Sequence, residues 1–130
     1  MASIRNVRRA VSTEGGWTFT FDHGNVLGDD NAGGGSRTYV DQKIVSLGNK
    51  HFYLVAMKSG SIYGFLSTDD GATFTNEGAI LLPSDFVTTG DSLHDPQIIA
   101  LPDGRYRIFV TLMNNRETGA SSIVSATTAK

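Results

Sequence analysis

The chain has 130 residues, of which 39% are hydrophobic and 18% are charged, and its formal net charge is −2 at pH 7. One globular domain is the expected class, and the near-neutral charge gives no reason to expect nucleic acid as a partner. The chain has no cysteine and 15 glycines, which excludes disulfides and thiolate metal sites and indicates a β-rich fold with many tight turns.

The N-terminal segment, residues 1–27, is expected to form two short strands, "NVRRAV" and "GNVL", around the polar turn "STEGGWTF". The basic residues Arg5, Arg8 and Arg9 are expected on one solvated strand face. No segment has the apolar run of a signal peptide or of a membrane span. We therefore expect no membrane partner. The expected location is cytoplasmic, or unknown if a leader has been trimmed.

The next segment, residues 37–82, is expected to be a complete unit of four strands. Its first part, "DQKIVSLGNKHFYLVA" from Asp41, has a short apolar run, the turn "GNK" and a run rich in aromatic and β-branched residues, which is the pattern of a hairpin. The third run is "SIYGFLS", and the turn "STDDGATF" leads into "GAILL" as the fourth.

The last segment, residues 95–130, repeats the first three of these strands. "DPQIIALPDGRYRIFV" from Asp95 aligns without a gap with the stretch that begins at Asp41, at an offset of 95 − 41 = 54 residues, and "SSIVSAT" is the third run. A recurring unit of four antiparallel strands is typical of β-propeller blades, of which the chain would supply about two. A β-sandwich of short strands is the alternative.

Two octapeptide turns, residues 12–19 and 67–74, share one frame. Serine, aspartate and glycine satisfy backbone groups in tight turns, so both octapeptides are expected to be structural, and Gly71 is expected at positive φ. A calcium loop is the alternative, but "DDG" lacks its alternating ligands, and we expect no metal and no cofactor. The matched positions are Ser12, Glu14, Gly16, Thr18 and Phe19 in the first turn and Ser67, Asp69, Gly71, Thr73 and Phe74 in the second.

The second octapeptide, "STDDGATF", resembles the Asp-box (BNR repeat) of sialidases and related propellers, Ser-x-Asp-x-Gly-x-Thr followed by an aromatic residue. "HDPQIIALPDGRYRIFV" resembles the innermost hairpin of blades in the sialidase and five-bladed glycosidase superfamilies. The resemblance covers nearly the whole chain. It implies a propeller fold more specifically than any activity, because such blades occur in proteins of different function.

The candidate site lies in four polar stretches expected at the rim opposite the two octapeptide turns: residues 28–41, 58–61, 83–95 and 113–120. Asp41 and Asp95 each precede the strand expected nearest the propeller axis, where the resemblance implies that acids are catalytic or tune the catalytic pair. Glycoside hydrolysis needs two carboxyl groups roughly 5 to 9.5 Å apart. The alternative is that each aspartate caps the first amides of its strand.

His94, next to Asp95, is the third candidate catalytic residue. The candidate ligand-binding residues are Arg37, Tyr39, Asp91 and Arg116. The resemblance to sialidases would imply three arginines for the substrate carboxylate, whereas this rim offers only two.

The expected function is therefore carbohydrate binding or glycoside hydrolysis at the axial mouth, with a glycan as ligand. The alternative is a non-catalytic oligomeric scaffold or protein-interaction module, which Trp17 favours because it lies in the turn expected on the far rim. Propellers need ~4 to 8 blades to close, so about two blades per chain imply a homo-oligomer. A trimer, with the six blades of the sialidases, is favoured, and a dimer is the alternative.

Overall fold

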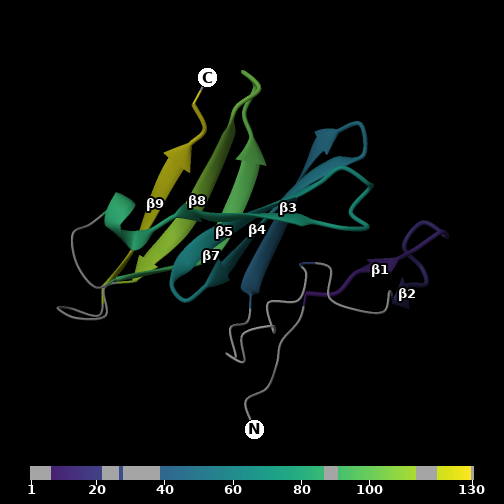
Figure 1. The fold of residues 1–130 in the computed structure, drawn as a ribbon, viewed down its shortest axis with the longest axis horizontal. Coiled ribbons are helices and arrows are strands. Elements are labelled where there is room, and N and C mark those ends of the chain that lie inside the picture. The colour runs from purple at the N-terminus through teal and green to yellow at the C-terminus, as the bar shows by residue number, and fades with distance from the viewer. Residues whose placement is uncertain (1–6, 22–26, 28–38, 87–90, 114–119, 130) are drawn as a thin grey trace, which may run out of the picture.

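The computed structural model describes residues 7–21, 27, 39–86, 91–113 and 120–129. In these ranges the protein is all-β, with three antiparallel sheets, none of which closes into a barrel (Figure 1). One turn of 3-10 helix, η2 (Pro83–Asp85), is the only helical element among them. The described part of the chain contains no helix with the length and apolarity needed to cross a membrane.

The largest sheet is a four-stranded meander that follows chain order. It consists of β3 (Val40–Gly48), β4 (His51–Lys58), β5 (Ser61–Ser67) and β6 (Thr75–Leu81). Two residues connect β4 to β5, so the stretch 58–61, expected among the polar loops, is a tight turn instead. Ser59 and Gly60 have φ of 52° and 77° there, and paired positive φ angles match the twist of a two-residue hairpin.

The second sheet has three strands in the order of the first three strands of the β3–β6 sheet. They are β7 (Ser92–Ala100), β8 (Tyr106–Met113) and β9 (Ser121–Thr127). The sequence places the start of the first of these strands at residue 95, and the structure begins β7 three residues earlier, because Ser92, Leu93 and His94 already pair with β8.

The two sheets also share a register. Ile44 lies opposite Leu54 in the β3–β4 pair, and Ile98 lies opposite Ile108 in the β7–β8 pair. Each residue of the second pair is 54 positions after its counterpart (98 − 44 and 108 − 54). The hairpins predicted from the ungapped self-alignment are therefore confirmed down to their cross-strand partners.

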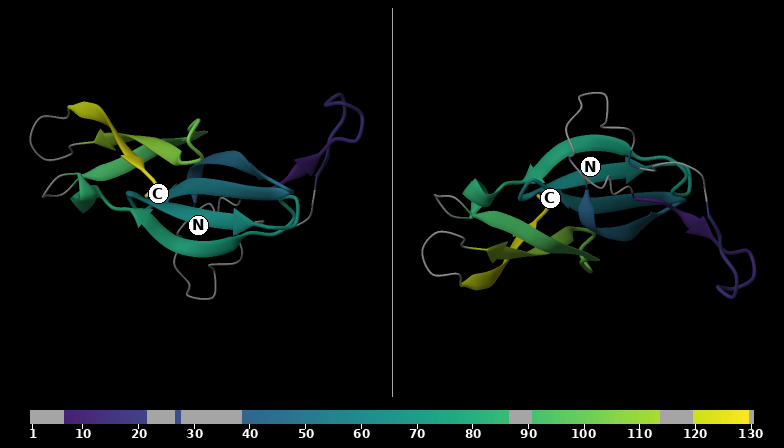
Figure 2. Two further views of the ribbon diagram at one scale, coloured as in Figure 1. Left: turned by 90° about the horizontal axis from the view of Figure 1, so that it is seen from above. Right: turned by 90° about the horizontal axis from the view of Figure 1, so that it is seen from below.

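The N-terminal segment forms a small antiparallel pair, β1 (Ala10–Val11) and β2 (Thr20–Phe21). This pair projects from the main body in both views of Figure 2. The expected strand "GNVL" lies mostly outside the described residues, of which only Leu27 is described, and Leu27 is buried.

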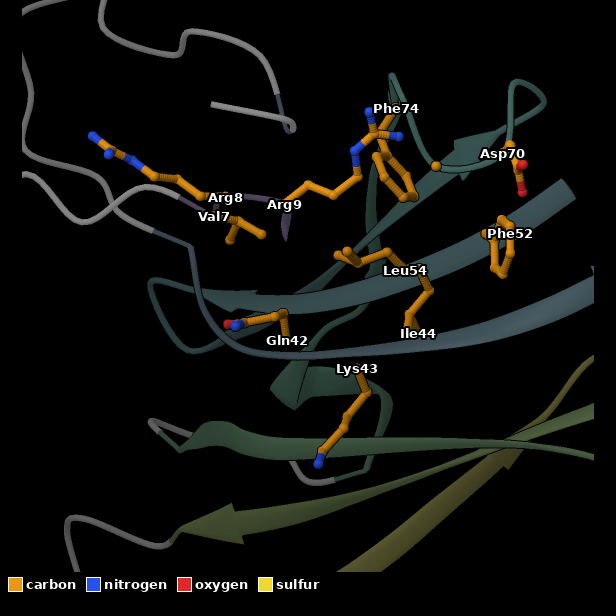
Figure 3. A pocket seen from close by; sticks show the side chains of 11 residues that line it. Val7, Arg8, Arg9, Gln42, Lys43, Ile44, Phe52, Leu54, Asp70 and Phe74 are labelled. Atoms are coloured by element: carbon orange, nitrogen blue, oxygen red, sulfur yellow. The ribbon is translucent and has the colours of Figure 1, made fainter. Parts of the chain in front are cut away.

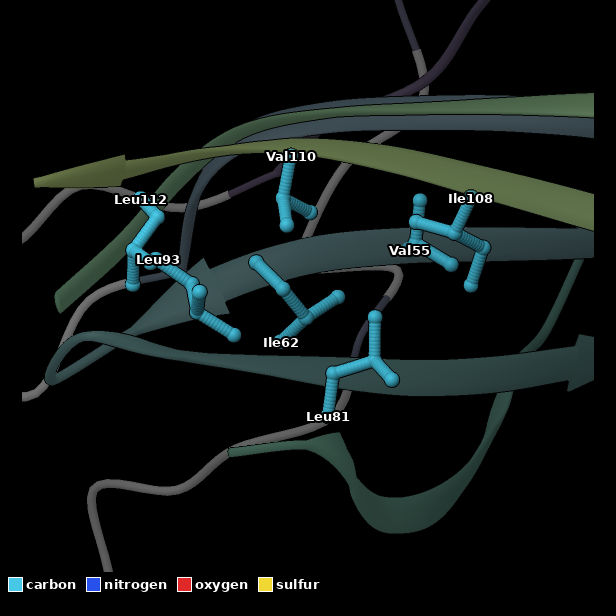
Figure 4. Packing of buried hydrophobic residues seen from close by; sticks show 7 residues of the cluster. All are labelled: Val55, Ile62, Leu81, Leu93, Ile108, Val110 and Leu112. Atoms are coloured by element: carbon cyan, nitrogen blue, oxygen red, sulfur yellow. The ribbon is translucent and has the colours of Figure 1, made fainter. Parts of the chain in front are cut away.

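The main core fills the space between the two larger sheets (Figure 4). Burying these branched side chains on both sides stabilises the pair of sheets, since each contributes about 1.5 to 3 kcal/mol. The cluster consists of Val55, Ile62 and Leu81 from the β3–β6 sheet and Leu93, Ile108, Val110 and Leu112 from the β7–β9 sheet.

A second cluster covers the opposite face of the β3–β6 sheet. Leu54, Ala56 and Phe65 are buried there with Leu27 and Tyr39, and Val7 packs against them. The four-stranded sheet is thus a central layer with apolar residues on both faces.

Candidate functional site

Asp41 and Asp95, the two predicted catalytic carboxylates, line one hollow of about 450 Å³ between β3 and β7. Each strand contributes an aspartate and the two residues that follow it: Asp41, Gln42 and Lys43 from β3, and Asp95, Pro96 and Gln97 from β7. The two triplets are equivalent in the repeat, at the same offset of 54 residues (95 − 41). We call this the Asp41–Asp95 hollow.

The backbone bends in the same way at both aspartates. Asp41 has φ of 56° and Asp95 has φ of 50°, and the ladder shifts register between Val40 and Lys43 and between His94 and Gln97. Sequence reasoning placed both aspartates in loops before a strand, whereas the structure places them inside strands at bulges. A non-glycine residue in this left-handed region costs on the order of 1–3 kcal/mol and is found preferentially at functional sites, and bulges re-aim side chains.

The lining of the hollow is polar and mostly exposed. Asp41, Lys43, Asp95 and Gln97 are exposed, and Pro96 is buried beneath them. Two carboxylates, two amides and one ammonium group can accept and donate hydrogen bonds to a hydroxylated ligand. No aromatic side chain that could stack on a sugar is among the described residues that line the hollow.

His94 is half-buried beside the hollow and is not one of its lining residues. Its Nε2 lies 2.7 Å from Ser92 Oγ. Asp91, predicted to bind ligand, is also half-buried, and its Oδ1 is enclosed with no hydrogen-bond partner among the described residues. A buried acceptor without a donor is costly, and an incoming donor would relieve that cost.

Tyr39 is also a predicted ligand-binding residue, and the structure places it in the core with 7% of its surface exposed. Its ring packs edge-on against Tyr63 and Phe65, with centroids 5.5 Å and 4.9 Å away. Its hydroxyl accepts hydrogen bonds from Lys58 Nζ at 3.3 Å and Asn76 Nδ2 at 3.1 Å. These contacts are those of a packing residue. Arg37 and Arg116 lie outside the described residues.

The second octapeptide turn is held by its own side chains. Ser67, 1% exposed, accepts from Gly71 N at 3.0 Å and donates to Asp69 Oδ1 at 2.9 Å. Asp69 in turn accepts from Thr73 N at 2.9 Å and from Thr73 Oγ1 at 2.6 Å. These two bonds from Thr73 lower the pKa of Asp69 to about 2. Gly71 has φ of 76°, so the predicted positive φ is confirmed.

The first octapeptide turn repeats this pattern with a longer acid. Ser12 Oγ accepts from Gly16 N at 3.0 Å, and Thr18 Oγ1 donates to Glu14 Oε2 at 2.8 Å. Gly16 has φ of 90°. In both turns the acidic side chain serves the turn itself.

The second turn also contacts the β3–β4 turn, because Asp70 N donates to Lys50 O at 2.9 Å. The two turns therefore lie at one end of the sheet, as predicted. Asp41 lies at the other end of β3, next to its first residue, Val40.

A second pocket, of about 280 Å³, lies on the face of the β3–β6 sheet that carries Leu54, opposite the main core (Figure 3). Ile44, Phe52 and Leu54 contribute apolar surface, and Arg8 and Arg9 contribute basic groups. Figure 3 shows Lys43 pointing away from Ile44 and Leu54. No sequence signal identified this pocket, because its lining comes from four segments that share no motif: residues 7–9, 42–44, 52–54 and 70–74.

The described residues bring no group of three or more histidine, aspartate or glutamate side chains together in a way that could hold a metal ion. No protein-family model matches the chain, and no curated protein sequence matches it significantly.

Proposed function

We propose that the chain is a sialidase-like β-propeller segment that binds carbohydrate through the Asp41–Asp95 hollow. The observation that supports this proposal is the convergence of two equivalent aspartates, each on a bulge with a left-handed backbone, on one polar hollow. Neither bulge is needed to continue a ladder, and each aims a carboxylate at the same space.

The chemistry of the hollow suits the hydroxyl groups of a sugar. Asp41 and Asp95 accept hydrogen bonds from hydroxyls, and Lys43 and the amide of Gln97 donate to ring and hydroxyl oxygens. In hydrolysis, one carboxyl group would protonate the glycosidic oxygen while the other acted as nucleophile or as base toward water. Because both aspartates are exposed, we propose binding as the primary activity and hydrolysis as a secondary one.

A glycan array and a panel of aryl glycosides at several pH values test this proposal. Asp41→Asn and Asp95→Asn remove the charges and keep the side-chain size, and both should abolish the array signal without changing the melting temperature by more than a few degrees. Asp103→Asn, at an exposed turn outside the hollow, is the matched control and should bind like the wild type. A signal that survives in both hollow variants would contradict the proposed site.

The second candidate function is a non-catalytic oligomeric scaffold. It is favoured by three exposed aromatic side chains of the β1–β2 region, away from the hollow: Trp17 is 88% exposed, Phe19 58% and Phe21 72%. Exposed apolar groups of this kind mark interaction surfaces. A chain that gives no signal with any glycan or glycoside, and that self-associates, would support the scaffold over the carbohydrate-binding module.

We propose further that the chain forms a homo-oligomer, with a trimer favoured over a dimer. Light scattering at several concentrations measures this directly. A monodisperse species of 13.9 kDa that persists across concentrations would rule the oligomer out.

A further inference from the structure

The strand β9 is the outer strand of its sheet. It pairs with β8 from Ser121 to Thr127, and along its other edge no strand pairs with it among the described residues. Unpaired backbone groups along an edge strand are a template for a further strand. Within the described ranges, this edge of the β7–β9 sheet is therefore unpaired along its seven residues.

An apolar cleft of about 410 Å³ lies between the two large sheets, at the C-terminal end of β9. The strand β9 contributes Ala126 and Thr127, and β6 contributes Ile80 and Leu81. No charged side chain is among the described residues that line the cleft; the others are Leu47, Tyr53, Ile98, Tyr106, Ile108 and Thr128. The edge thus combines free backbone groups with an apolar space for side chains.

The repeat shows what kind of segment fits there. Phe65 lies opposite Leu54 in the β4–β5 pair, and Ala126 lies opposite Ile108 in the β8–β9 pair, so β5 and β9 occupy equivalent positions. In the β3–β6 sheet the other edge of β5 is paired with β6. The free edge of β9 is therefore the place that β6 fills in the first sheet.

We propose that this edge is a peptide-binding site that accepts an extended strand of the β6 type by β-augmentation. The ligand is a peptide of about seven residues that pairs antiparallel with β9, with uncharged side chains facing the cleft. Backbone hydrogen bonds supply the affinity in this mode of recognition, and the pockets for alternate side chains supply the specificity.

A fluorescent synthetic peptide with the sequence of Thr75–Leu82, "TNEGAILL", is the probe, and its anisotropy is measured against increasing concentrations of the full chain. We expect saturable binding together with slower amide exchange in residues 121–127. A scrambled peptide should bind at least tenfold more weakly. A peptide N-methylated at alternate residues, which cannot complete the ladder, should also lose binding, and neither change alters the protein.

Two variants of β9 test whether the peptide contacts the face of the strand that borders the cleft. Ala126→Arg puts a charge into the cleft and should weaken binding at least tenfold. Ile123→Arg is the matched control, because Ile123 lies opposite Thr111, is 70% exposed and does not line the cleft; it should bind the peptide like the wild type. Melting curves confirm that both variants are folded.

Three outcomes would overturn the proposal. Equal binding of the scrambled or N-methylated peptide would show that backbone pairing is not involved. No binding by a monomeric chain at millimolar peptide would exclude the site. Self-association that Ala126→Arg abolishes and the peptide cannot displace would assign the edge to a second copy of the chain instead of a peptide ligand.

Discussion

Gly64 lies on β5 against the ring of Tyr53 from β4, and the substitution Gly64→Ala tests how tightly the two strands are packed. A Cβ at this position would overlap Tyr53 Oη, and it would lie 2.8 Å from Tyr53 Cζ and 3.0 Å from Ile80 Cγ2. Optimal contacts between carbon atoms are about 3.5–4.0 Å. The ring therefore has to shift by at least about 0.7 Å to accommodate one methyl group.

The ring cannot shift freely, because Tyr53 Oη donates a hydrogen bond of 2.7 Å to Glu77 Oε2. Overpacking costs about 1–3 kcal/mol, and the strained or lost hydrogen bond adds about 0.5–1.5 kcal/mol. We therefore expect Gly64→Ala to lower the free energy of unfolding by about 2–4 kcal/mol, out of the 5–15 kcal/mol that is typical of a whole domain.

Urea unfolding measures this cost, and a second background identifies its cause. In Tyr53→Ala the overlap with the ring is gone and only the 3.0 Å approach to Ile80 Cγ2 remains, so Gly64→Ala should cost about 1 kcal/mol or less in that background, because alanine loses less chain entropy in a strand than glycine. A cost of less than 0.5 kcal/mol for Gly64→Ala in the wild type, or an equal cost in both backgrounds, would refute the steric reasoning.

Three further predictions concern single residues. Gly71→Val should cost about 1–3 kcal/mol because valine disfavours φ of 76°, whereas Gly71→Asn should cost less, and chemical denaturation compares the two. The hydrogen bonds from Thr73 lower the pKa of Asp69 to about 2. The ionised carboxylate therefore stabilises the fold above about pH 4, and this stabilisation is lost as the pH falls toward about 2. The melting temperatures of the wild type and Asp69→Asn should converge over that range, and a constant difference would contradict the assignment. Burial, followed by the hydrogen bond and the charge of Glu77, raises the pKa of Tyr53 above its ordinary value of 10.0; stability should therefore fall as the pH rises above about 10, and Tyr53→Phe should reduce this alkaline loss.

The features that sequence reasoning predicted well are short in range. The hydrogen bonds from Gly71 N to Ser67 Oγ and from Thr73 Oγ1 to Asp69 join residues within one octapeptide, so the residue types alone indicate the turn. The hairpins follow from apolar runs separated by turn residues, and the ungapped self-alignment transfers the register of one hairpin to the other. The all-β class, the strand order within the two large sheets and the structural use of Asp69 were accessible for this reason.

The features that sequence reasoning missed or misplaced depend on chain segments that are far apart. Tyr39 has a polar hydroxyl and adjoins a polar stretch, and only the packing of Tyr63 and Phe65 around it shows that it belongs to the core. The left-handed backbone at Asp41 arises from a bulge against β4, which the local sequence does not signal.

The sequence by itself determined the local elements, because turn chemistry and alternation of apolar residues act over a few positions. Only the tertiary structure decided which polar groups meet. Asp41 and Asp95 share a hollow because β7 packs alongside β3, and Ala126 borders an apolar cleft because residues of both large sheets line it. Both sites are spaces between strands that are tens of residues apart, so their shape depends on long-range packing and not on any one stretch of the chain.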